Sequence, residues 1–305
     1  MQNNELESQS GLKLISLLTF IFAFGLFTVL GSNDDIPMNL DNSATIAVLK
    51  IIQGFSVLII FILPAVLFSV FWTKPGIHYL GITSKPSFSS LLISGILMLL
   101  SLPLINWLAD INQHLKLPEM LNGIEIWMKN SEEKAKVLTD AFTEGDSLGV
   151  LFLNLIVIAL LAALSEELFF RGVLQKVLIE CTRNKHLGVW IGAIIFSAFH
   201  MQFYGFLPRM LMGAFLGYLF LWSGSLWLGI FAHFINNGMA VLIIWLINKN
   251  VIPENIEKVG IQSGEWIYAV MSLLILITGL LLVYKKESKK NALLALKREE
   301  DTLAP

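Results

Sequence analysis

Long apolar runs, separated by short polar connections, dominate the chain. Most extend for roughly 20 residues, the length that an α-helix needs to cross the hydrocarbon core of a bilayer. The pattern predicts about eight transmembrane helices, at residues 12–30, 46–72, 88–109, 147–170, 188–207, 208–222, 226–248 and 266–284. The predicted fold class is therefore an all-α, polytopic membrane helix bundle. Because the run at 208–222 is short, we expect it to form a tight re-entrant pair with the run before it.

The segment 117–143 follows a different pattern. Apolar residues such as Met120, Ile124 and Trp127 recur at helical spacing, while acids and lysines occupy the other positions. A helix with one apolar and one charged face lies along a membrane surface or packs over a bundle. We therefore predict an extra amphipathic helix here, on the outer surface, whose simplest role is to connect two spans.

The first apolar run, at residues 14–30, also has the length of a signal-peptide core. Its flank carries Glu5 and Glu7 but only one base, Lys13, and no A-x-A cleavage site follows. A signal peptide has a basic flank and such a site. We interpret the run as a retained first span.

Basic residues alternate between the two sides of the predicted bundle. Connections that would share a side with the N-terminus hold Lys74, Lys85, Lys176, Arg183 and Lys185, and the tail holds Lys285, Lys286, Lys289, Lys290, Lys297 and Arg298. The connection at 31–45 has no base. Cytoplasmic loops carry the excess of lysine and arginine, so both termini are predicted to face the cytoplasm.

Composition supports a membrane location and excludes several other classes. Of the 305 residues, 55% are hydrophobic and 14% are charged, whereas soluble domains carry about 25% charged residues. The formal net charge of -2 gives no indication of a nucleic-acid partner. Cys181 is the single cysteine, which excludes an intrachain disulfide and a cysteine-rich metal site. The expected partner is the lipid bilayer, in a bacterial inner membrane, and the sequence does not reveal the oligomeric state.

The stretch "ALSEELFFRGVLQ" places three charged residues in an apolar run. Ionisable residues inside a span are functional candidates. Glu167 and Arg171 are four apart, so on a helix they share a face and can form an ion pair. Glu166 lies about 100° around the helix from Glu167 and has no partner there, which makes it a candidate general base. A solvated position of all three at the cytoplasmic end of the span would explain them equally well.

Two later runs contribute histidines and an amide. His200 ends "FSAFH", and His233 lies four residues before Asn237 in "HFINN", with Asn236 a competitor for the same role. A single buried histidine is usually a core residue, and a membrane asparagine commonly bonds a neighbouring helix. Together with Glu166, however, they supply what is needed to activate a water molecule against a carbonyl. We expect the four side chains to meet in the cytoplasmic half of the bilayer.

The ordered set "EELFFR", "FSAFH" and "HFINN" resembles the three motifs of the CPBP intramembrane proteases. This family includes type 2 CAAX prenyl endopeptidases and bacterial Abi-type immunity and bacteriocin-processing relatives. The likeness covers roughly residues 147–248. The family's site residues correspond, without a departure, to Glu166, Glu167, Arg171, His200, His233 and Asn237.

The resemblance implies hydrolysis of a peptide bond of a membrane-associated peptide or protein. In this reading Glu166, assisted by His200, deprotonates a water molecule, while His233 and Asn237 donate hydrogen bonds to the oxyanion. The ion pair on the same helix would hold Glu166 in place, and a conical cavity open to the cytoplasm would supply water. The chain then divides into N-terminal helices and the amphipathic segment (1–146), a catalytic core (147–248), and a last span with a charged tail (249–305).

Other readings remain open. Glu166, His200 and His233 also form a two-histidine, one-carboxylate set that can hold Zn²⁺, although we prefer a glutamate mechanism without a cofactor. A catalytically silent membrane scaffold and a proton-coupled transporter are the alternatives from other classes. The small residues of "GAFLG", at 213–217, let helices approach closely and fit any of these functions.

Overall fold

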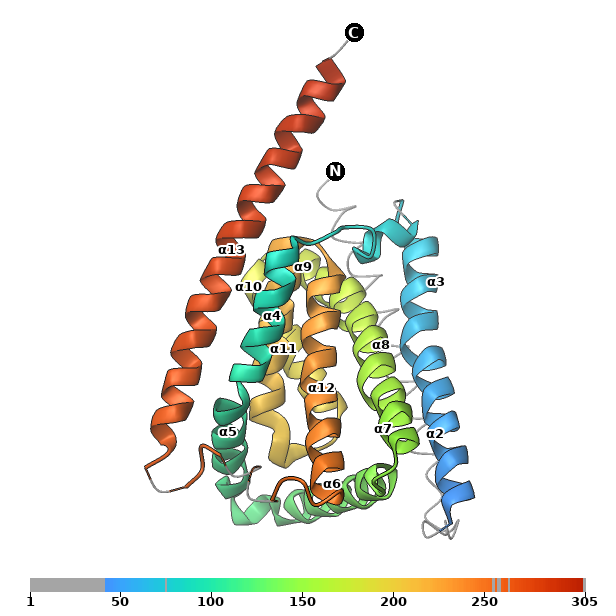
Figure 1. Ribbon diagram of the computed structural model, residues 1–305. Helices are drawn as coiled ribbons and strands as arrows, with labels where there is room; N and C mark the ends of the chain where they lie inside the picture. The colour runs from blue at the N-terminus through green and yellow to red at the C-terminus, as the bar shows by residue number, and fades with distance from the viewer. Residues whose placement is uncertain (1–41, 75, 254–255, 257–258, 263, 304–305) are drawn as a thin grey trace.

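A computed structural model describes residues 42–74, 76–253, 256, 259–262 and 264–303 of the chain (Figure 1). The first expected span, at 12–30, lies outside these residues. All regular structure in the described part is helical: α2 (Ser43–Val57), η1 (Leu58–Ile62), α3 (Leu63–Trp72), η2 (Gly76–Leu80), α4 (Phe88–Leu100), α5 (Leu102–His114), η3 (Glu119–Leu121), α6 (Asn122–Thr143), α7 (Leu148–Asn154), η4 (Leu155–Leu161), α8 (Ala162–Phe169), η5 (Phe170–Leu174), α9 (Gln175–Thr182), α10 (Lys185–Phe199), η6 (Phe203–Gly205), α11 (Phe206–Ser223), α12 (Leu226–Asn248) and α13 (Trp266–Leu303).

Several of these helices run on into one another and form long apolar rods. Five rods are long and apolar enough to cross a membrane: Ala44–Trp72, Leu148–Thr182, Phe203–Ser223, Leu226–Asn248 and Trp266–Leu294. The bent pair α4 and α5 makes six if it counts as one span, and α10 is a shorter apolar helix. A polytopic all-α bundle is therefore confirmed, whereas the number of about eight spans is not confirmed by the described residues.

The span predicted at 88–109 is broken. Helices α4 and α5 meet at an angle of 46°, and Pro103 occupies the first turn of α5. Proline has no backbone N–H and its ring clashes with the preceding helical turn, so a continuous helix is disfavoured there. The proline was visible in the sequence, and the continuous apolar pattern on both sides concealed the bend.

Capping residues mark where the helices that carry the candidate site begin and end. The side chain of Asn184 accepts hydrogen bonds from the first backbone N–H groups of α10, and Ser225 does the same for α12. Gly224, with φ +65°, ends α11 in the left-handed conformation that glycine adopts without strain. These short connections make α10, α11 and α12 consecutive antiparallel neighbours.

Small residues let α11 pack closely against its neighbours. A Cβ atom on Gly213 would lie 3.1 Å from the Cα of Ala193 in α10. The carbonyl oxygens of Gly213 and Gly217 accept hydrogen bonds from Arg171 Nη2, at 3.1 Å, and from Gln175 Nε2, at 3.0 Å. The small-residue patch is thus used for packing within the chain, and it brings backbone acceptors to buried polar side chains.

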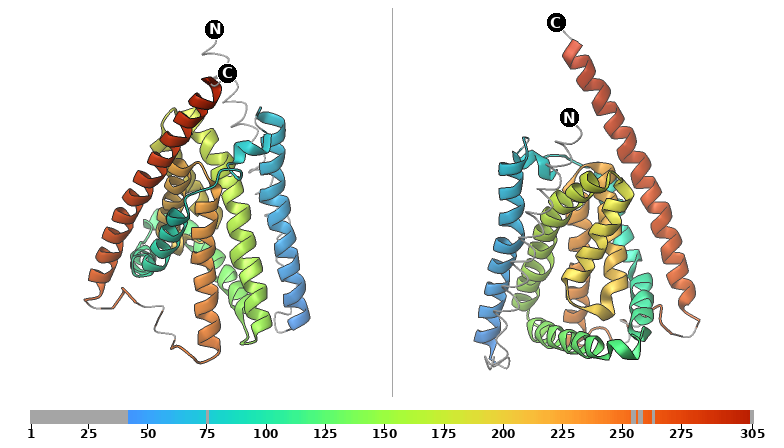
Figure 2. Two further views of the ribbon diagram at one scale, coloured as in Figure 1. Left: turned by 45° about the horizontal axis from the view of Figure 1, so that its top comes forward. Right: turned by 180° about the vertical axis from the view of Figure 1, so that it is seen from behind.

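Helix α6 runs across one end of the bundle (Figures 1 and 2). It is tied there by Asn248 Nδ2, which donates to Thr143 O at 2.8 Å, and by Asn154 Nδ2, which donates to Phe142 O at 2.9 Å. The amphipathic helix predicted over the bundle is therefore confirmed. At the opposite end α13 continues beyond the other helices, and the connections that hold Lys74, Lys85, Arg183 and Lys185 lie on that side.

Candidate active site

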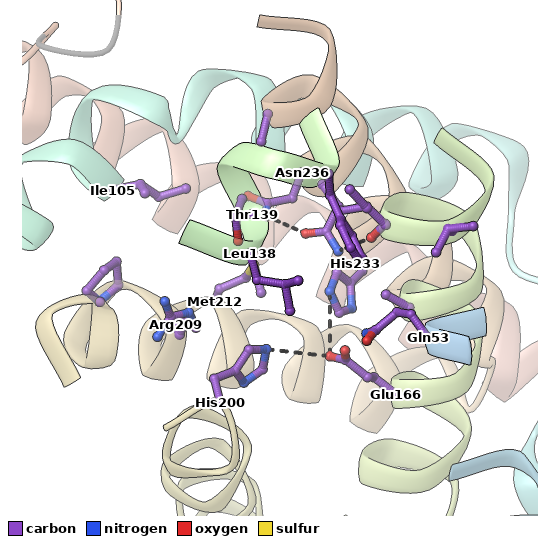
Figure 3. Close-up of a pocket in the computed structure, with 18 residues that line it drawn as sticks. Gln53, Ile105, Leu138, Thr139, Glu166, His200, Arg209, Met212, His233 and Asn236 are labelled. Carbon is purple, nitrogen blue, oxygen red and sulfur yellow. Dashed lines mark hydrogen bonds and ion pairs between the residues drawn. The ribbon is translucent and has the colours of Figure 1, made fainter. Parts of the chain in front are cut away.

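Three helices bring the candidate side chains to one cavity of about 510 Å³ (Figure 3). Glu166 comes from α8, His200 follows the last residue of α10, and His233 belongs to the second turn of α12. Asn237, one turn further along α12, lines the same cavity. The structure thus gathers all four residues, which are spread over about 70 positions of sequence.

Glu166 lies between the two histidines. Its Oε2 atom is 3.9 Å from Nε2 of His200 and 3.9 Å from Nε2 of His233. These separations are too long for direct hydrogen bonds, and Oε2 is buried with no hydrogen-bond partner within the described residues. A buried carboxylate oxygen without a partner is costly. A separation of 3.9 Å matches a water molecule that bridges Oε2 and an imidazole nitrogen, at about 2.8 Å from each.

Each imidazole ring is oriented by a contact of its Nδ1 atom, on the side of the ring away from Glu166. His200 Nδ1 lies 2.9 Å from the carbonyl oxygen of Phe196, and His233 Nδ1 lies 3.0 Å from Oε1 of Glu167. A carbonyl oxygen can only accept, so the proton of a neutral His200 is on Nδ1 and the Nε2 lone pair faces Glu166. The same holds for His233 if Glu167 is ionised. Three acceptor atoms then converge on one point, which requires a hydrogen-bond donor or a cation there.

The second glutamate belongs to a buried ion pair. Glu167 Oε1 lies 2.7 Å from Nη1 of Arg171, as the four-residue spacing predicts, and the two side chains are 0% and 3% exposed. The guanidinium also stacks 4.4 Å from the ring centre of Phe196. The same oxygen of Glu167 thus accepts from Arg171 and lies 3.0 Å from Nδ1 of His233. The sequence did not reveal this link to His233.

Close helix packing makes room for the carboxylate of Glu167. A Cβ atom on Gly229, four residues before His233 in α12, would lie 2.7 Å from Glu167 Oε2. Any larger residue at this position would therefore press on the carboxylate. The absence of a side chain lets α12 approach α8 closely enough for the histidine to reach its partner.

The two asparagines of α12 also bond to each other. Asn237 Nδ2 lies 3.3 Å from the carbonyl oxygen of Ile158 in η4, and Asn236 Nδ2 donates to Asn237 Oδ1 at 3.1 Å. Both line the cavity. Asn236 thus contacts the amide oxygen of Asn237, and the second amide hydrogen of Asn237 has no partner within the described residues.

The cavity extends from Glu166 toward the end of the bundle that α6 covers. Leu138 and Phe142 of α6 and Ala240 of α12 line it there. The distribution of basic residues assigns this end to the outside, whereas the family resemblance implies a cavity open to the cytoplasm. The two expectations are therefore incompatible, and Glu166 lies near the middle of its rod rather than near a cytoplasmic end.

Sequence reasoning missed one charged residue of the cavity. Arg209 lines the wall beside His200 (Figure 3), and it is not among the predicted site residues. It belongs to the first turn of α11. Its position directly after Pro208, at the start of an apolar helix, was the available signal.

The chemistry of the Glu166, His200 and His233 set suits a zinc ion, because both Nε2 atoms are oriented acceptors whose Nδ1 atoms are already bonded. The spacing suits it less well. Ligand atoms of a tetrahedral zinc site lie about 3.3–3.6 Å apart, so the 3.9 Å separations would have to contract. As they stand, the described residues include no group of three or more His, Cys, Asp and Glu side chains arranged to hold a metal ion.

Comparison with known proteins agrees with the motifs. Residues 148–239 match the family described as type II CAAX prenyl endopeptidase Rce1-like. The chain is also 34% identical over 86 residues to the uncharacterized protein YpbD of Bacillus subtilis (strain 168), a match that covers 27% of this chain. The chain spans about two fifths (41%) of the length of that relative. No solved structure matches the chain.

These findings confirm the resemblance for residues 148–239. Together with the long apolar helices, they identify an integral membrane protein. The family is one of endopeptidases. The matched residues include all six site residues of the three motifs.

We expect Arg171→Met to lower the free energy of unfolding by about 3–5 kcal/mol, because it leaves the carboxylate of Glu167 buried without its cation. The double variant Glu167→Leu/Arg171→Met should be more stable than this single variant, since no charge is then buried alone. Thermal unfolding of purified protein in detergent measures both.

The surface variant Lys129→Met is the matched control. Lys129 pairs with Glu125 on α6 and is 58% exposed, so its loss should change the unfolding midpoint little. A single variant as stable as the double variant would contradict the ion-pair interpretation.

Proposed function

We propose, because residues 148–239 form an Rce1-like domain, that the chain is an intramembrane endopeptidase. It would hydrolyse a peptide bond of a membrane-associated peptide or protein with a water molecule activated by Glu166. The observation that carries this proposal is the unpartnered Oε2 atom of Glu166, 3.9 Å from each of two oriented imidazole nitrogens.

In the proposed reaction the water molecule donates one hydrogen bond to Glu166 and the other to His200. Glu166 takes a proton as the water oxygen attacks the scissile carbonyl carbon, and it later passes that proton to the leaving amine. The apolar bundle around the cavity strengthens each electrostatic interaction with the reacting atoms.

The carbonyl oxygen becomes an oxyanion during the attack. Asn237 can donate its second amide hydrogen to it, and one such donor is typically worth about 3–4 kcal/mol in the transition state. His233 can donate from Nε2 when that nitrogen carries a proton. Equal distances from Glu166 to the two histidines leave their roles interchangeable at this point.

A zinc-dependent form of the same hydrolysis is the second candidate. The convergence of three acceptor atoms favours it, and Glu166, His200 and His233 would hold the ion. Bound zinc would lower the pKa of a water molecule and polarise the carbonyl. The scaffold and transporter alternatives gain no specific support from the cavity, which combines a base, histidines and an amide donor.

We expect Glu166→Gln and His200→Ala to lower cleavage by about 100-fold or more, because each removes a group that holds or deprotonates the water. The measurement is quantitative proteomics of membrane fragments from the native host expressing each variant. Glu125→Gln makes the same change on the surface of α6 and should cleave like the wild type. Wild-type levels of fragments with Glu166→Gln would refute the assignment of the base.

Dialysis against a chelator separates the two mechanisms. We expect the purified protein to keep its activity after dialysis, because the spacing of the three ligands is wider than that of a zinc site. Activity is measured on a substrate that the proteomics identifies. Complete loss after dialysis, with recovery on addition of zinc, would establish the metal-dependent form instead.

We further propose that the chain lies in a bacterial inner membrane with both termini in the cytoplasm, as the basic residues indicate. Helix α6 would then face the outside. A cysteine at Met120, which is 88% exposed beside α6, should react with a membrane-impermeant maleimide in intact cells when Cys181 is replaced by serine. A cysteine at Lys74, at the other end, should not react. The reverse labelling would invert the orientation and open the cavity toward the cytoplasm.

A further inference from the structure

The cavity contains one cationic side chain that the proposed hydrolysis does not use. Of the lysines and arginines in the described part of the chain, Arg209 alone lines the cavity, on the wall beside His200 (Figure 3). It is partly buried in the first turn of α11, at the wall of a cavity that also holds the reacting groups. A charged side chain at such a place is a candidate for binding a ligand of opposite charge.

The guanidinium of Arg209 is held in one orientation by Gln202. Nη1 donates to the backbone oxygen of Gln202 at 2.7 Å, and Nη2 donates to its side-chain oxygen at 2.5 Å. An arginine carries five N–H donors. Two are bonded to the glutamine, so three remain for a ligand in the cavity.

The loop that carries Gln202 is fixed in turn by α5. Asn112 is buried, and its Nδ2 donates to Phe203 O while its Oδ1 accepts from Leu207 N, both at 2.7 Å. The two bonds join the first residue of η6 and the second residue of α11 to one side chain. The segment between Gln202 and Arg209 is therefore anchored to α5.

Gly205 gives the guanidinium its place. A Cβ atom on this residue would lie 2.7 Å from Nη2 of Arg209 and 2.9 Å from its Cζ. The backbone of Gly205 has φ -108° and ψ 14°, a conformation that other residues adopt. An added methyl group would thus displace the arginine side chain without straining the chain.

Arg209 differs from Arg171 in having no carboxylate beside it. Within the described residues, Arg171 pairs with Glu167 at 2.7 Å, whereas no aspartate or glutamate oxygen lies within 4.0 Å of Arg209. Its bonds to Gln202 are to neutral oxygens, and the carboxylates of Glu132 and Glu166 act on its charge without forming an ion-pair contact. A planar guanidinium with free donors favours a carboxylate.

We propose that Arg209 forms an anion subsite that binds a carboxylate of the peptide held for cleavage. The inference rests on the proposed endopeptidase function, and it adds a rule of specificity. Because Arg209 and Glu166 are both fixed to the bundle, the bound carboxylate would lie at a set distance from the scissile bond. The carboxylate can be the free C-terminus of the peptide or the side chain of an acidic residue.

Binding tests the proposal without requiring turnover. The protein carries Glu166→Gln to prevent cleavage, and energy transfer from tryptophan reports the binding of dansyl-labelled tripeptides in detergent. The probes are dansyl-Ala-Leu-Leu as the free acid, the same peptide as the C-terminal amide, and dansyl-Ala-Asp-Leu amide. Comparison of the first and third probes distinguishes binding of a terminal carboxylate from binding of a side-chain carboxylate. Glycerol 3-phosphate is added as a competitor that represents a lipid headgroup.

We expect at least one carboxylate probe to bind about tenfold or more tightly than the neutral amide, as charged hydrogen bonds allow. Arg209→Gln should abolish that difference, and Gly205→Ala should reduce it by displacing the guanidinium. Arg209→Lys should retain part of it because the charge remains. Arg183→Gln, an exposed arginine outside the cavity, is the matched control and should bind like the parent protein.

Four outcomes would overturn the proposal. Two concern the probes: equal binding of the acidic and neutral probes, and absence of binding by every probe. The other two are a preference that survives Arg209→Gln and competition by glycerol 3-phosphate with no preference for a carboxylate. Failure of the endopeptidase function would show instead as unchanged fragments with Glu166→Gln in the native host, so the two failures are distinguishable.

Discussion

The buried ion pair between Glu167 and Arg171 is the constraint on which the site depends. An unpaired charge in an apolar bundle is costly, so each partner requires the other. Both side chains also make further contacts, although Oε2 of Glu167 has no hydrogen-bond partner within the described residues. Arg171 reaches the backbone of α11 at Gly213, and Glu167 reaches His233 of α12. A single pair of charges fixes three helices relative to one another, and with them the ring that faces the cavity.

Adjacent carboxylates take opposite roles because a helix turns by about 100° per residue. Glu167 faces the interior, where its charge is balanced, and Glu166 faces the cavity, where it is not. The inner carboxylate orients an imidazole, and the outer one meets that imidazole from the other side at 3.9 Å. Glu167 thus has a structural role and Glu166 a chemical one. The ion pair stabilises the fold while the carboxylate of Glu166 remains available to bind water.

The sequence was sufficient for features that depend on local spacing. The Glu167–Arg171 pair, the amphipathic helix at α6 and the apolar rods follow from helical periodicity. The meeting of Glu166, His200 and His233 could be inferred from the motif order of a known family but not from spacing, because it depends on how three helices pack. The bond between Glu167 and His233, the bend before α5 and the place of Arg209 in the cavity were missed. The first and the last are set by contacts between residues far apart in sequence, whereas the bend follows from Pro103 and was hidden by the apolar pattern on both sides of it.

Gly229 has no functional group, yet the geometry of the candidate site depends on it. Since a methyl group there would collide with Oε2 of Glu167, any change at this position would move the carboxylate, then the ring of His233, and finally the place where a water molecule can rest. Among relatives of this chain, glycine at this position should therefore be inherited together with the histidine one turn later. Conservation of that glycine would then reflect the space that the site needs and not the flexibility of the backbone.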